Sequence, residues 1–65
     1  MTEQEFWTIV NKAESGDIEA MKRAAFLFIE VANQHTAAGR IEQAASLIKK
    51  VDEYRKKIKT VDPTW

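Results

Sequence analysis

The sequence of 65 residues contains no cysteine, one histidine, one proline and two glycines. The absence of cysteine excludes disulfide bonds, thiolate zinc sites and a cysteine nucleophile, and it fits a reducing compartment. One histidine cannot by itself build a histidine-rich metal site, because zinc takes about four ligands. We therefore expect no metal and no cofactor.

Long apolar runs and net charge are missing as well. The longest apolar stretch, residues 24–29, has six residues, whereas a membrane-spanning helix needs about 20. The opening residues 1–5 are acidic, whereas a secretory signal begins with basic residues. Ten basic and ten acidic residues balance to a net charge of zero. These features predict a cytoplasmic protein without a membrane segment.

The helix boundaries can be predicted from the few turn-forming residues. Thr2 and Glu5 have the spacing of a capping box and predict a helix over about residues 2–14. The Ser-Gly-Asp sequence at 15–17 supplies a glycine to end that helix and an N-cap for a second helix over about residues 18–37.

The second glycine and the proline divide the remainder of the chain. Gly39 ends the second helix, and apolar residues at helical spacing predict a third helix over about residues 41–59. Pro63 disfavours a further helical turn, so residues 60–65 should form a non-helical tail. Residues 1–65 are thus expected to form one all-α domain of three antiparallel helices, with the second helix between the other two.

The second predicted helix is apolar on nearly every side over residues 24–32. Such a helix must be covered on more than one side. A closed bundle would supply that cover, whereas an open layer would leave one face for a second copy or another protein. A chain of this size hides only about 60% of its unfolded surface, so a second subunit is a common source of stability.

The second and third predicted helices resemble one tetratricopeptide repeat. The repeat pattern places an aromatic residue, a Leu-Gly pair, a Tyr, an Ala, a Phe and a Pro at fixed spacing. That register holds Phe28, Val31, Ala32, His35, Ala44, Ile48 and Lys56 in this sequence. The turn at 38–45 is similar to the turn within a repeat, and residues 13–20 are similar to the junction between repeats. The resemblance covers about one and a half repeats. It implies a helical-hairpin module that binds protein and associates with itself, because such repeats normally need about three copies to bury a continuous core.

Side chains that could carry catalysis are few. Neither a nucleophile nor an orienting carboxylate lies near His35 in the sequence, so we interpret this residue as packing between the second and third helices. Ser15 fits a turn and Ser46 fits a helix surface, and neither lies in a strand–turn–helix elbow. The sequence therefore predicts a protein that is not an enzyme and has no small-molecule substrate.

Cations gather in the second half of the third predicted helix. The candidates for phosphate contacts are Lys49, Lys50, Lys56, Lys57 and Lys59. We favour a solvated helix end over a phosphate site, because Asp52 and Glu53 lie among these lysines and the helix dipole favours cations there. If the lysines do contact phosphates, the alternative function is a nucleic-acid-binding or nucleic-acid-mimicking regulator.

Six residues extend the apolar stripes beyond what one hairpin can cover. These candidates for self-association or partner contact are Trp7, Phe26, Ile29, Leu47, Tyr54 and Trp65. Trp7 either completes the core or forms an exposed anchor, and Trp65 either folds back or protrudes. We expect a non-enzymatic protein–protein interaction module, an adaptor, regulator or inhibitor that works as a homodimer.

Overall fold

A computed structural model describes residues 2–65 of the chain, and over that range it contains three α-helices and no strand. The helices are α1 (Glu3–Glu14), α2 (Ile18–Ala37) and α3 (Ile41–Lys59). The predicted all-α fold is confirmed, and the predicted helix ends agree to within one residue.

Side chains cap the first two helices where the sequence predicts it. The backbone N–H of Glu5 donates to Oγ1 of Thr2 at 3.2 Å, and the N–H of Thr2 donates to Oε2 of Glu5 at 3.4 Å. At the start of α2, the N–H of Ala20 donates to Oδ1 of Asp17 at 3.1 Å. These bonds satisfy N–H groups that have no partner within their helix.

Two glycines make the tight turns that reverse the chain. Gly16 has φ 104° and Gly39 has φ 82°, which is the left-handed region that residues with a Cβ disfavour. Each turn leads into the next helix within a few residues. Consecutive helices are therefore held close together as neighbours.

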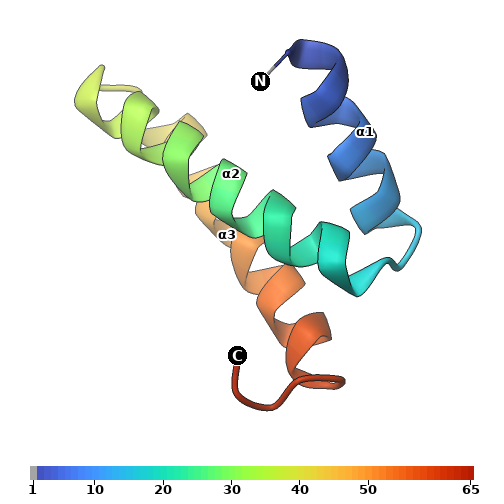
Figure 1. Cartoon of the computed structure of the whole chain (residues 1–65). Helices are drawn as coiled ribbons and strands as arrows, with labels where there is room; N and C mark the ends of the chain where they lie inside the picture. The colour runs from blue at the N-terminus through green and yellow to red at the C-terminus, as the bar shows by residue number, and fades with distance from the viewer. Residues whose placement is uncertain (1) are drawn as a thin grey trace.

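The second helix is the centre of the fold (Figure 1). α3 runs back along α2 to form a hairpin, and α1 packs on α2 at an angle, so that the tip of the hairpin extends beyond it. This confirms that α2 lies between the other two helices. The arrangement is an open one, because α1 and α3 each pack mainly on α2.

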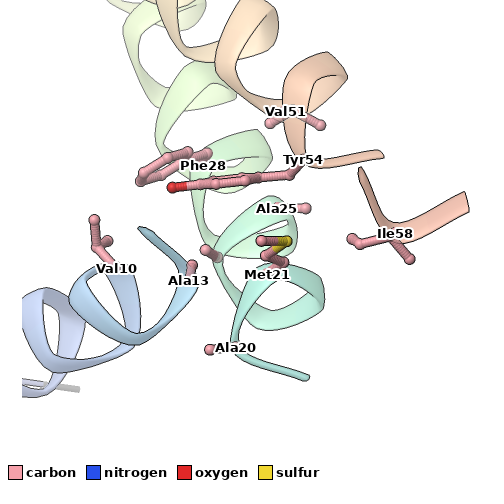
Figure 2. Packing of buried hydrophobic residues seen from close by; sticks show 10 residues of the cluster. Val10, Ala13, Ala20, Met21, Ala25, Phe28, Val51, Tyr54 and Ile58 are labelled. Carbon is pink, nitrogen blue, oxygen red and sulfur yellow. The ribbon is translucent and has the colours of Figure 1, made fainter. Parts of the chain in front are cut away.

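The core lies where the three helices meet (Figure 2). This core cluster consists of Val10, Ala13, Ala20, Met21, Ala24, Ala25, Phe28, Val51, Tyr54 and Ile58, and the other buried hydrophobic residues are Ala32 and Ala44. Half of these residues are alanines, which let the helices approach closely but bury little apolar area each. The large side chains are few, and the rings of Phe28 and Tyr54 stack at 5.8 Å between centroids.

Residues 60–65 form turns after α3 and fold back toward the hairpin. The N–H of Asp62 donates to the carbonyl of Ile58 at 2.7 Å, and the ring of Trp65 packs on Phe26 at 5.6 Å between centroids. Of the two alternatives for Trp65, the structure thus has the one in which it folds back. Over residues 2–65, no helix combines the length and the apolar character that crossing a membrane would require.

Candidate functional site

The six predicted interface residues do not form one surface. Tyr54 is only 1% exposed and lies in the core, so its assignment to an interface is wrong. It is buried because its ring fills the junction of all three helices, against Phe28 of α2. Leu47 is partly buried and packs against the same core cluster, so it too contributes mainly to the fold of the monomer.

Trp7 lies on α1, apart from the others. Trp7 is 53% exposed, and its ring packs on that of Phe6 in a T-shaped arrangement at 5.4 Å between centroids. Phe6 in turn packs on Phe28, at 5.8 Å between centroids. Of the two alternatives for Trp7, the structure therefore has the exposed one, with Phe6 between it and the core.

Phe26 and Ile29 lie on the side of α2 that faces away from α1. Successive residues of a helix are rotated by about 100°, so Phe26 is about 200° from Phe28, which contacts α1. Phe26 is 64% exposed and Ile29 is 37% exposed. This side of α2 is therefore left uncovered by the helices of its own chain.

The third helix continues this uncovered surface. Ile41 and Ile48 are exposed. Ile41, Ile48 and Arg55 follow one another at intervals of seven residues, so all three lie along one side of α3. Arg55 itself lines a groove together with Phe26 and Ile29 of α2. We call the surface formed by Phe26, Ile29, Ile41 and Ile48 the open face.

At one end of the open face, the tail forms a shallow groove of about 330 Å³. Its lining residues are Ala25, Phe26, Ile29, Val51, Arg55, Thr64 and Trp65. Aromatic residues and arginine are the residue types that contribute most often to the binding energy of protein interfaces. The groove therefore combines apolar contact area with a single charged hydrogen-bond donor group.

The tail that forms the groove is held by polar contacts. Nζ of Lys22 lies 3.3 Å from Oδ2 of Asp62 and 5.8 Å from the centre of the Trp65 ring. The hydroxyl of Thr64 donates to Oδ1 of Asp62 at 2.6 Å. The hydrogen bond from Thr64, followed by that from Lys22, lowers the pKa of the Asp62 carboxyl. The ionised form of Asp62 thus holds the tail in place.

A second polar cluster joins α1 to α3, and sequence reasoning missed it. Oη of Tyr54 donates to Oε1 of Glu14 at 2.7 Å, and Nζ of Lys50 lies 2.9 Å from the same oxygen. These hydrogen bonds, that of Lys50 first, lower the pKa of Glu14. Burial and the bond to Glu14 raise the pKa of Tyr54 above its usual range. The cluster positions α1, and no local sequence pattern connects residues that are 40 positions apart.

The predicted phosphate-contact lysines do not form a single site. Lys50 is bound by Glu14 and by Glu53, whereas Lys49, Lys56, Lys57 and Lys59 are exposed and make no ion pair within the described chain. Lys56 and Lys57 point to different sides of α3, because adjacent residues differ by about 100°. Only Lys56 and Lys59 come together, in a hollow of about 250 Å³ that Asp52 and Arg55 also line.

The candidates for chemistry have structural partners. Nε of Arg40 donates to Nδ1 of His35 at 2.7 Å across the α2–α3 turn. The hydroxyls of Ser15 and Ser46 donate to backbone carbonyls of Lys12 and Glu42. Within residues 2–65, no group of three or more His, Asp or Glu side chains is arranged to hold a metal ion.

Comparison with known proteins adds no relative to this description. No protein-family model, no curated protein and no solved structure matches the chain significantly. The resemblance to tetratricopeptide repeats therefore remains a prediction from the sequence.

Proposed function

We propose that this chain is a non-enzymatic protein-interaction module, a small helical hairpin of the tetratricopeptide-like kind that binds a protein partner or itself by packing helices on the open face. The observation that carries the proposal is the exposure of Phe26 (64%) and Ile48 (42%) on the side of the hairpin opposite α1. In this account the protein works in the cytoplasm as an adaptor, regulator or inhibitor, and as a homodimer.

Physical considerations support a docking role for the open face. Single exposed apolar side chains are ordinary, but a row of four large ones on one side of two adjacent helices marks a surface that gains free energy by being covered. Phe26 and Trp65 already pack together at the end of this row. They provide a preformed aromatic anchor that loses little side-chain entropy on binding.

Affinity capture with matched variants tests the proposal. Phe26→Glu places a charge on the open face, and Thr8→Glu places the same charge on an exposed position of α1. We expect the wild type and Thr8→Glu to retain the same partner, whether a different protein or an untagged copy of the chain, and Phe26→Glu to lose it. Equal retention by all three proteins would contradict the proposal.

A nucleic-acid-binding or nucleic-acid-mimicking regulator is the second candidate function. The observation in its favour is that Lys49, Lys56, Lys57 and Lys59 are exposed and form no ion pair within the described chain. Binding through these lysines would weaken steeply as salt rises, because it releases counterions from the phosphates. A mobility-shift assay at low salt, with the wild type and a Lys56→Gln/Lys59→Gln variant, decides the matter. The absence of a shift with the wild type would exclude binding to nucleic acid through these lysines.

A further inference from the structure

We propose that the partner of the open face is a second copy of this chain, packed hairpin against hairpin about a two-fold axis. The inference rests on the proposed function and specifies its partner. In the resulting dimer, α2 and α3 of both copies form a four-helix arrangement, with α1 of each copy on the outside.

The size of the open face selects an occupant with two helices. α2 has 20 residues, so it spans about 30 Å, and two adjacent helices are about 20 Å wide. The whole side of the hairpin that carries the open face therefore covers roughly 600 Å², and two such sides roughly 1,200 Å², which is the lower limit of about 1,200–2,000 Å² for stable interfaces. A single helix would cover roughly half of the face, whereas a second α2–α3 hairpin has the required dimensions.

The charges around the open face also fit a second copy. Asp52 and Arg55 are exposed on α3 three residues apart, and Lys22 pairs with Asp62 beside the tail. A border of one sign would select a partner of the opposite sign, whereas a border of both signs accepts a surface identical to itself. The net charge of the chain is zero, so two copies do not repel each other as strongly charged chains do.

A two-fold axis is favoured because the open face is more apolar than the other exposed surfaces of the chain that could contact it. A head-to-tail assembly would place a different surface of the second copy on the open face, such as the outside of α1, where Trp7 lies among the exposed polar residues Gln4, Thr8 and Asn11. Such a contact would offer one large apolar side chain, Trp7, and would leave most of the apolar row facing amides and hydroxyls. A two-fold axis instead places the apolar row of one copy against the same row of the other, as closed symmetric dimers require.

Single cysteines provide the test, because the chain has none of its own. We would treat full-length Ile48→Cys and Ser46→Cys with a short bis-maleimide cross-linker. Both positions are exposed and both are on α3, but they differ by about 200° around the helix. We expect covalent dimers from Ile48→Cys and not from Ser46→Cys. Ile29→Cys, which lies on α2, is a second probe of the open face in case Ile48→Cys fails to fold.

The outcomes separate this inference from the proposed function. A wild type that scatters light as a monomer at every concentration would overturn the second copy as partner, and a captured different protein would still support the proposed function. A dimeric wild type that cross-links through Ser46→Cys, and not through Ile48→Cys or Ile29→Cys, would overturn the open face as its interface. Selective cross-linking through Ile48→Cys or Ile29→Cys supports the inference.

Discussion

Tyr54 is the residue on which the three helices converge. Its ring stacks on Phe28 of α2, its hydroxyl donates to Glu14 of α1, and Nζ of Lys50 lies 5.1 Å from its ring centre. Burial of the ring and satisfaction of the hydroxyl both depend on α1 being in place. Tyr54 therefore links the packing of α1 to that of the hairpin.

Separate substitutions of Tyr54 distinguish these contributions. Tyr54→Phe keeps the ring and removes the hydrogen bond, so it should lower the free energy of unfolding by about 0.5–1.5 kcal/mol. Tyr54→Ala also removes the ring and should cost about 3–5 kcal/mol. Urea unfolding followed by circular dichroism measures both values. Equal losses in the two variants would contradict a role for the ring in the core.

Glu14 should make stability depend on pH. Its pKa is lower in the folded chain because Lys50 and Tyr54 donate to it, so the unfolded chain binds the proton more readily. The stabilisation is complete above the pKa of the unfolded state and is lost as the pH falls through the lowered pKa of the folded state. Urea unfolding at about pH 7 and about pH 3 should therefore show a smaller acid loss in Glu14→Gln than in the wild type.

An exposed acid serves as the control for this experiment. Glu30 lies on the surface of α2 and makes no ion pair within the described chain. Glu30→Gln removes a carboxylate without removing the cluster. If Glu14→Gln and Glu30→Gln changed the acid loss equally, the Glu14 cluster would not be its source.

The sequence alone could not show which aromatic residues lie in the core and which lie on the surface. Tyr54 and Phe26 both have the aromatic character of an interface residue, and the sequence offers no local signal that separates them. Their roles differ because α1 covers one side of the hairpin and not the other. The side of the hairpin that α1 covers depends on contacts such as that of Glu14 with Tyr54, between residues 40 positions apart.

The bounds of the helices could be predicted because capping residues and glycines lie at their ends. Thr2 with Glu5, Asp17 and the two glycines determine where α1 and α2 begin and end, and each acts within four residues of its position. Local signals of this kind can be identified in a sequence without knowledge of tertiary contacts. The angle of α1 to the hairpin has no such signal.

The α2–α3 turn gives a test at this scale. Gly39 has φ 82° and nothing within 4 Å of the place where a Cβ would stand, so a substitution there meets conformational strain and no collision. Gly39→Ala should cost about 1 kcal/mol of unfolding free energy. Gly39→Asn should cost less, because asparagine tolerates the left-handed region. A larger loss in Gly39→Asn than in Gly39→Ala would contradict this explanation.

At the scale of the whole molecule, the excess of apolar residues is the central feature. The sequence indicated that α2 needed cover on more than one side, and the structure covers it with α1 on one side and α3 on another. The open face is what remains. Phe26 and Ile29 were predicted as contact residues and do lie on it, whereas Leu47 and Tyr54 pack in the core instead, because the residues that stay exposed depend on how α1 packs.

The mass of the wild-type protein in solution tests the central claim most directly. Light scattering after size-exclusion chromatography, at several concentrations and two ionic strengths, should give twice the chain mass of 7.5 kDa. The dimer should persist at high salt, because apolar burial is not screened as exposed charges are. A mass of one chain under all these conditions would contradict the claim that a second copy covers the open face.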